Sequence, residues 1–176
     1  MVMFVEKKLI MDELAIQRSL KRITHEIIER NKGVEDLILV GIRTRGIHLA
    51  NELAALIRAF EGASIPTYDL DIRHWRDDHK RMDQVSTQQI PVQEKKVILV
   101  DDVLFKGRTI RAAMDAITSF GRAKEIQLAV LIDRGHRELP IRADYIGKNI
   151  PSSLNESIQV KVESLDHENA VYICHS

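Results

Sequence analysis

Residues 97–109 read Val-Ile-Leu-Val-Asp-Asp-Val-Leu-Phe-Lys-Gly-Arg-Thr. The four apolar residues at its start are typical of a strand that is buried on both faces of a parallel sheet. Two acids then stand where open α/β sheets bind ligands, beyond the carboxyl end of the strand. The loop after them opens a helix, whose free N–H groups and positive dipole end favour a phosphate. Because carboxylates can hold sugar hydroxyls beside that phosphate, the stretch predicts a phosphorylated sugar as ligand, although an acid pair can also simply cap the next helix.

Strand and helix alternate along most of the chain. We expect helices over 12–31 and 47–58 and strands over 37–42 and 126–132, besides the strand and helix within 97–119. Strands separated by helices of this size indicate parallel βαβ units, with right-handed crossovers that cover both faces of one sheet. The sequence shows no internal repeat or linker. It therefore predicts one α/β domain over the whole chain, 1–176, with a central parallel sheet flanked by helices.

Two segments break this alternation. Residues 71–95 are long and polar with little periodicity, which inside a compact domain is typical of a flexible loop or functional lid. The chain becomes irregular again after residue 133. We expect short strands near 143–147, 158–163 and 170–174, which would add an edge to the sheet or form a small cap.

Composition narrows the function classes. The chain has 26 basic and 26 acidic residues, so any nucleic-acid surface must be a local patch. The single cysteine, Cys174, rules out a disulfide within one chain and suits a reducing cytoplasm. Residues 1–10 are too short and too charged for a signal peptide, and no apolar run reaches the length of a membrane span. We expect a cytoplasmic protein without a membrane partner.

A second loop, Arg43-Thr44-Arg45-Gly46, also ends a strand and opens a helix. Arginine gives forked, charge-assisted hydrogen bonds to phosphate oxygens, and glycine lets the backbone approach a ligand closely. Alone, such a loop is more often a solvated turn. Beside the 97–109 loop on one sheet edge, it predicts a diphosphate site, with one loop holding a sugar 5′-phosphate and the other the leaving diphosphate.

The 97–109 string resembles the PRPP-binding signature of type I phosphoribosyltransferases. Together with 40–47, 130–151, 25–33 and 75–78 it resembles one family within that class, the PyrR proteins, which are bacterial bifunctional pyrimidine operon attenuators and uracil phosphoribosyltransferases. The resemblance covers nearly the whole chain, and its most specific block is 133–151. The sequence departs from the family pattern at Lys21, Trp75 and Lys106, where the family usually has threonine, tyrosine and a small hydroxyl residue.

The resemblance implies the type I phosphoribosyltransferase fold, with a small hood formed largely by residues after 133. It implies that uracil N1 displaces diphosphate from PRPP to give UMP, with Mg²⁺ as cofactor. Asp101 and Asp102 would hold the ribose hydroxyls or the metal, directly or through water. The implied catalytic candidates are Arg45, Arg76, Asp77 and Asp78, where either aspartate could be a base or only organise the loop. The implied PRPP and nucleotide site comprises Thr44, Arg45, Gly46, Asp101, Asp102, Val103, Leu104, Phe105, Lys106, Gly107, Arg108 and Thr109, and the base site Arg134, Gly135 and Ile158.

The resemblance also implies regulation by RNA binding. In the family, UMP or UTP promotes attachment to a stem-loop of pyrimidine operon leader mRNA, which favours termination, and the proteins form homodimers or larger homo-oligomers. The matching candidates for RNA contact are Arg22, His25, Arg30, His136, Arg137, Arg142 and Lys148. From the residues alone, exposed charged helix faces are more often simply solvated.

Two other functions are compatible with the sequence. Lys106 either adds a cation for the 5′-phosphate or crowds the loop, and in the second case the protein would be an RNA-binding regulator with weak or lost transferase activity. A salvage phosphoribosyltransferase for another base, such as a purine, is the third possibility, and the 133–151 block argues against it.

Overall fold

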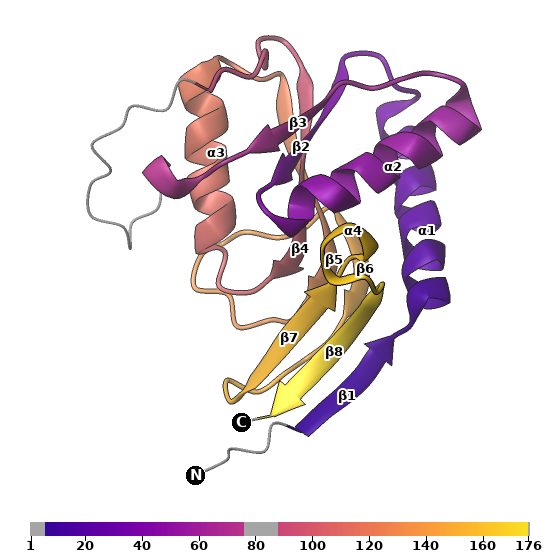
Figure 1. Cartoon of the computed structure of the whole chain (residues 1–176). Helices are drawn as coiled ribbons and strands as arrows, with labels where there is room; N and C mark the ends of the chain where they lie inside the picture. The colour runs from indigo at the N-terminus through magenta and orange to yellow at the C-terminus, as the bar shows by residue number, and fades with distance from the viewer. Residues whose placement is uncertain (1–5, 76–87, 176) are drawn as a thin grey trace.

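A five-stranded parallel sheet forms the centre of the protein (Figure 1). The computed structural model describes residues 6–75 and 88–175. The strands of the central sheet are β2 (Leu37–Ile42), β3 (Thr67–Leu70), β4 (Lys96–Leu104), β5 (Glu125–Asp133) and β6 (Tyr145–Asn149). Their order across the sheet is β3-β2-β4-β5-β6, and every neighbouring pair is parallel. The α/β fold class expected from the sequence is confirmed.

Helices cover both faces of this sheet (Figure 1). Helices α1 (Glu13–Asn31) and α2 (Arg45–Glu61) lie on one face, and α3 (Arg108–Phe120) lies on the other. Side chains of a strand alternate between faces, so Ile98 and Val100 pack with α1 and α2 whereas the neighbouring Leu99 packs with α3. The continuous apolar run of β4 is therefore buried on both sides, as its sequence predicted.

The first helix begins and ends with recognisable caps. Asp12 accepts a hydrogen bond from the Ala15 backbone N–H at 2.8 Å, as expected for an N-cap. At the other end the left-handed cap residue is Lys32, and the N–H of Gly33 reaches back to the carbonyl of Ile28 at 3.0 Å. Helix α1 therefore has the length that its apolar stripe predicted.

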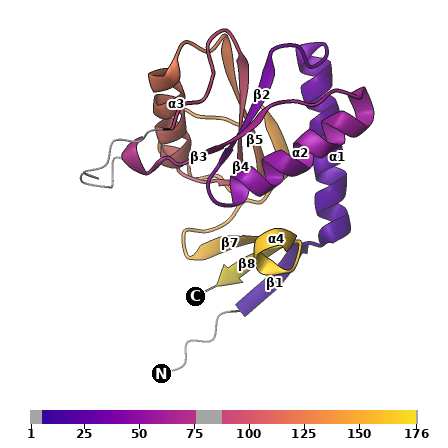
Figure 2. The same ribbon diagram turned by 45° about the horizontal axis from the view of Figure 1, so that its top comes forward.

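A small antiparallel sheet forms the hood (Figure 2). Its strands are β1 (Glu6–Met11), β8 (Ala170–His175) and β7 (Glu156–Lys161), in that order, with the short helix α4 (Glu163–Asp166) between β7 and β8. The sequence predicted the two C-terminal strands but not β1. The N-terminus thus completes a hood whose other strands come from the end of the chain.

Within the segment predicted as a polar loop, 71–95, the structure describes residues 71–75 and 88–95. Arg73–Trp75 forms one 3₁₀ turn after β3. Further along, Ile90 and Val92 are buried in the core beside α3.

In residues 6–75 and 88–175, no helix has the length and apolar character that crossing a membrane requires.

Candidate active site

The two loops singled out in the sequence meet at one edge of the central sheet. Parallel pairing places Gly41 of β2 opposite Val100 of β4, so the loop after β2 lies beside the acid pair that follows Val100. Gly46 makes this approach possible, because a Cβ there would lie 2.4 Å from the Val100 carbonyl oxygen. A hollow of about 580 Å³ opens between the two loops. Its polar lining consists of Arg43, Thr44, Arg45, Asp71, Arg73, Asp101, Asp102 and Thr109.

The acid pair forms the floor of this hollow. Asp101 is 8% exposed and accepts a hydrogen bond from the Asp102 N–H at 2.9 Å, while Asp102 accepts one from the Val103 N–H at 2.8 Å. Burial raises the pKa of Asp101 well above its usual range, and the neighbouring Asp102 carboxylate adds to the effect. A ligand that donates a hydrogen bond or brings positive charge to Asp101 therefore stabilises its ionised form.

The hollow also offers oxygen ligands for a hard cation. Mg²⁺ commonly binds one or two carboxylates and completes its shell with substrate phosphates and water. Asp101 and Asp102 both line the hollow, and Asp102 is partly exposed there. In the described part of the chain no three His, Cys, Asp or Glu side chains are grouped to hold a metal unaided. The residues present fit a magnesium ion that arrives with a phosphorylated substrate.

An ion-pair cluster that we did not predict forms one wall of the hollow. Arg43 pairs with Asp69 at 2.9 Å and with Asp71 at 3.2 Å, and Arg73 pairs with Asp71 at 2.6 Å. Hydrogen bonds from Arg73 hold the pKa of Asp71 below its usual value. Arg43 thereby fastens the end of β2 to β3. The only sequence signal was the alternation in Asp69-Leu70-Asp71, which a four-residue strand makes hard to recognise.

Arg45, the predicted diphosphate ligand, begins helix α2 and lines the hollow. Its Nη2 donates to Asp166 of the hood, at 2.9 Å from Oδ1 and 3.2 Å from Oδ2. Its Nε is buried and has no hydrogen-bond partner among the described residues. Thr44 is exposed just before it. The guanidinium therefore lies between the candidate diphosphate site and the hood.

The loop after β4 forms a second, smaller hollow of about 350 Å³, lined by residues 103–110 and Glu138. Gly107 has φ 93° and is the N-cap of α3, a left-handed conformation that glycine adopts without strain. Lys106 is exposed, with its Nζ 5.5 Å from the centre of the Phe105 ring. Leu104 points into the core, so only its backbone faces the loop.

The residues predicted to bind the base lie at the junction with the hood. Arg134 and Gly135 line a hollow of about 490 Å³. The Arg134 guanidinium is buried under the hood and donates to Ser152 Oγ at 2.9 Å and to the carbonyl oxygens of Ser153 and Glu156 at 3.1 and 2.6 Å. It also lies 3.9 Å from the centre of the Phe105 ring. Arg134 thus joins the phosphate loop to the hood.

Ile158, the third residue predicted at the base site, comes from β7 of the hood. It is partly buried and packs against the same part of the core as Val103, which stands at the end of β4. Ile158 does not line the hollow that contains Arg134. The hood therefore brings an apolar side chain to the core cluster that Val103 also contacts.

Two of the three α1 residues predicted to contact RNA lie against the sheet edge formed by β5 and β6, and the third contacts α2. Arg22 donates to the carbonyl oxygens of Ile146 and Gly147 at 3.0 and 2.7 Å. Arg30 pairs with Asp144 at 2.6 Å and with Glu125 at 3.1 Å. His25 stacks on Phe60 of α2, with ring centres 4.4 Å apart. The two arginines thus fasten the helix to the sheet edge while their side chains stay about half exposed.

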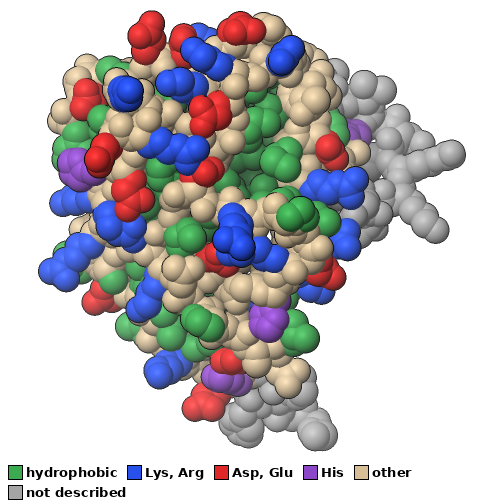
Figure 3. All heavy atoms as spheres, turned by 180° about the vertical axis from the view of Figure 1, so that it is seen from behind, with side chains coloured by type: hydrophobic (Ala, Val, Ile, Leu, Met, Phe, Trp, Pro, Cys, Tyr) green, Lys and Arg blue, Asp and Glu red, His purple; other side chains and the backbone are tan. Residues whose placement is uncertain are grey.

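The C-terminal candidates for RNA contact fall into two groups. The ring of His136 contacts the Ser152 carbonyl, and Arg137 pairs at 2.6 Å with the buried Asp133. Arg142 and Lys148 are exposed. On the face shown in Figure 3, Lys and Arg side chains are interspersed with Asp and Glu, in keeping with the zero net charge. The candidates Arg76, Asp77 and Asp78 lie outside the described residues.

The fold and its sheet edge with two loops are those of a phosphoribosyltransferase. Residues 9–167 match the family model described as phosphoribosyl transferase domain. Solved structures of hypoxanthine phosphoribosyltransferases share the fold. The enzyme of Trypanosoma cruzi matches with a TM-score of 0.74 and 17% identity, and the match covers 96% of both chains. The enzyme of Staphylococcus aureus has a TM-score of 0.72 at 18% identity, covering 94% of this chain and 90% of its own.

Closer relatives are named bifunctional protein PyrR. The protein of Clostridioides difficile is 53% identical over 96% of this chain and 98% of its own. The protein of Listeria welshimeri is 56% identical over 93% of this chain and 94% of its own. The chain belongs to the PyrR family. The family, the fold and the enzyme class expected from the sequence are confirmed.

Proposed function

We propose that the protein transfers the ribosyl phosphate of PRPP to uracil, giving UMP and diphosphate, and that with bound UMP or UTP it attenuates pyrimidine operons by attaching to leader mRNA. The observation that carries the enzymatic half is the meeting of two strand-to-helix loops beside a carboxylate pair at one sheet edge. That arrangement matches a sugar with a phosphate at one end and a diphosphate at the other.

Each part of the substrate has a site in this proposal. The N–H groups of the loop at 105–109 and the start of α3 hold the 5′-phosphate. Asp101 and Asp102 accept hydrogen bonds from the ribose hydroxyls, and Arg45 lies against the diphosphate. Asp101 and Asp102 would hold Mg²⁺, directly or through water, and the bound ion would supply positive charge to the diphosphate oxygens.

No side chain needs to attack the sugar. The protein accelerates the displacement by holding uracil N1 against ribose C1′ and by stabilising the charge that develops on the leaving diphosphate. Arg45 supplies positive charge there, and Arg76 is a second candidate. Asp77 or Asp78 takes the uracil proton or organises the loop. Of these four residues only Arg45 lies within the described ranges.

The enzymatic half is tested by a base panel. Purified protein with PRPP and Mg²⁺ is incubated with uracil, hypoxanthine or guanine, and diphosphate release is measured. We expect release with uracil only. Release with hypoxanthine alone would replace the proposal by purine salvage. If no base gives release but the protein still binds RNA in the presence of UMP, the protein is a regulator without transferase activity.

Lys106→Thr tests the departure from the family pattern in the phosphate loop. The lysine side chain is exposed and lies over Phe105, and Lys106 contributes its backbone carbonyl to the Glu138 N–H at 2.9 Å. A threonine keeps that backbone and adds a compact phosphate donor. We expect kcat/KM for PRPP to be preserved or raised. A large fall would show that the lysine charge itself binds the 5′-phosphate.

The regulatory half is supported by the basic side chains that α1 and β6 bring together. Lysines and arginines on such a surface bind RNA phosphates in a salt-dependent way, while specificity comes from unpaired bases. Arg137 is a poor target for charge reversal, because a glutamate there would face the buried Asp133 carboxylate. The exposed Arg142 and Lys148 are better targets.

Arg142→Glu combined with Lys148→Glu is expected to abolish binding of a leader stem-loop in a filter assay with UMP, and to leave uracil transfer nearly unchanged. The matched control reverses two other exposed charges, Lys8 and Arg122, and so alters net charge equally. Equal RNA affinity of the two double variants would remove Arg142 and Lys148 from the interface.

The proposal includes assembly and location. We propose a cytoplasmic homodimer or larger homo-oligomer, as leader transcripts and PRPP both occur in that compartment. Leu14 of α1 and Leu165 of α4 are large apolar side chains that remain 52% and 42% exposed in the single chain. Sedimentation at several protein concentrations tests this, and a monomer at all of them would contradict it.

A further inference from the structure

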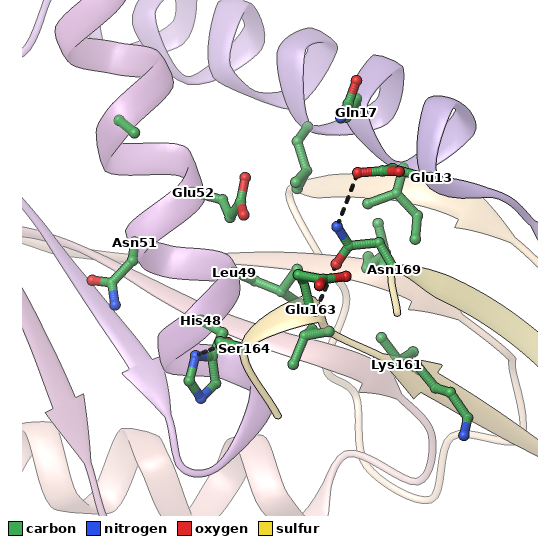
Figure 4. A pocket seen from close by; sticks show the side chains of 16 residues that line it. Glu13, Gln17, His48, Leu49, Asn51, Glu52, Lys161, Glu163, Ser164 and Asn169 are labelled. Carbon is green, nitrogen blue, oxygen red and sulfur yellow. Dashed lines mark hydrogen bonds between the residues drawn. The ribbon is translucent and has the colours of Figure 1, made fainter. Parts of the chain in front are cut away.

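The hood is fastened to the first turn of α2 at two points. Arg45 and His48 lie three residues apart, so both point from that turn toward the hood. Arg45 binds Asp166, and His48 Nδ1 lies 2.7 Å from Ser164 Oγ, as the close view in Figure 4 shows for the second pair. Both hood residues belong to α4. The turn that carries the diphosphate loop is therefore held from the hood.

Asp166 is itself fixed in place. Its Oδ2 accepts a hydrogen bond from the Val162 backbone N–H at 2.9 Å, and its side chain is only 18% exposed. That hydrogen bond, followed by those from Arg45, holds the pKa of Asp166 below its usual value. The carboxylate that meets Arg45 is thus ionised at neutral pH and is held by a backbone hydrogen bond within its own turn.

Such a partner lowers the entropic cost of using Arg45 to bind a ligand. A free arginine side chain samples many rotamers, and ordering it on binding would weaken the interaction. Here one NH₂ group is bound to both Asp166 oxygens, while the side chain stays 35% exposed and lines the diphosphate hollow. The remaining donors of the guanidinium are therefore oriented before any ligand arrives.

We propose that Asp166 is a positioning residue for diphosphate: from the hood, it holds the Arg45 guanidinium at the sheet edge where the leaving group binds. This inference rests on the proposed transferase function and deepens it. Asp166 does not touch the substrate. Its effect reaches the reaction through Arg45, whose charge stabilises diphosphate as the bond to ribose C1′ breaks. The hood thus contributes to leaving-group stabilisation as well as to base binding.

Three variants separate this role from mere support of the hood. Asp166→Ala removes the acceptor, Asp166→Asn keeps one oxygen for Arg45 without the charge, and Ser164→Ala removes the other contact between α4 and α2. For each we would measure kcat and KM with uracil and PRPP, the affinity for magnesium diphosphate by calorimetry, and the midpoint of thermal unfolding.

We expect Asp166→Ala to lower kcat/KM for PRPP and the affinity for magnesium diphosphate by about tenfold, the scale of ordering one long side chain. The KM for uracil should not change. Asp166→Asn should recover only part of the loss, because its single oxygen cannot accept from both Arg45 and the Val162 N–H. Ser164→Ala should stay within about twofold of wild type. If Ser164→Ala has the same effect as Asp166→Ala, or if Asp166→Ala binds magnesium diphosphate as tightly as wild type or more tightly, the proposal is wrong.

Failure of the proposed function gives a different result. A wild-type protein that releases no diphosphate with uracil would refute the transferase. The calorimetric comparison of Asp166→Ala with wild type would still decide whether Asp166 orients Arg45 toward diphosphate.

Discussion

Asp101→Asn is expected to make the protein more stable and much less active. Asp101 is buried, and burying a carboxylate costs more free energy than burying an amide. The free energy of unfolding should therefore rise by about 1–3 kcal/mol at neutral pH, and the variant should unfold at a higher denaturant concentration. The amide oxygen can still accept the Asp102 N–H. Uracil transfer should fall roughly 10- to 100-fold, because the ribose loses a charged hydrogen-bond acceptor worth about 1.5–3 kcal/mol.

The stability difference should depend on pH with a defined sign. The pKa of Asp101 is raised in the folded protein, so the folded state binds more protons than the unfolded chain between the ordinary aspartate range and the raised value. The contribution of Asp101 to folding is therefore present at low pH and lost as pH rises through the folded pKa. The advantage of Asp101→Asn should be smallest below about pH 4 and grow toward neutral pH.

Denaturant unfolding of wild type and variant at several pH values measures this difference. Asp115→Asn is the matched control, since that aspartate is exposed on α3 and should show neither the stability gain nor the loss of activity. A difference between Asp101→Asn and wild type that does not change with pH would mean that the Asp101 carboxylate is not destabilised by burial.

Gly46→Ala is expected to separate the two loops of the active site. The added Cβ would lie 2.4 Å from the carbonyl oxygen of Val100, and because both partners are backbone, no side chain can rotate to make room. We expect a loss of about 3 kcal/mol or more in the free energy of unfolding and loss of measurable PRPP binding, since α2 must move away from β4.

Gly62→Ala is the control for the glycine itself. Gly62 ends α2 with φ 71°, and a Cβ there would meet nothing within 4 Å. Only the left-handed conformation is penalised, at about 1 kcal/mol. Denaturant unfolding and PRPP calorimetry on both variants test the prediction. Equal stability of the two would show that the loop after β2 can retreat from β4 without cost.

The sequence predicted the strands of the central sheet except β3, because the signals of the others are local. An apolar run such as Val97–Val100 and an amphipathic stripe along α1 each lie within one segment. Parallel strands then bring the loops after β2 and β4 to the same edge, so the meeting of Thr44 and Arg45 with the acid pair followed from the fold. The observed hollow contains both loops.

What the sequence did not predict depends on partners far along the chain. Strand β1 forms only because β8, at the other end, supplies its hydrogen bonds. The partner of Arg45 is Asp166, 121 residues later. Arg134 stays a prediction for the base site, and the contacts of its guanidinium with the carbonyl oxygens of Ser153 and Glu156 had no local signal in the sequence. The motif indicates a basic side chain at this place, whereas only the folded chain decides what that charge contacts.

The pairing of β1 with β8 makes the two chain ends neighbours, with Glu6 opposite His175 (Figure 1). Deleting residues up to Met11 would leave β8 with an open edge, and unpaired strand edges promote association between molecules. Any extension at either end continues from a strand of the hood. Preparations meant for RNA binding or kinetics are therefore best compared after any affinity tag has been cleaved.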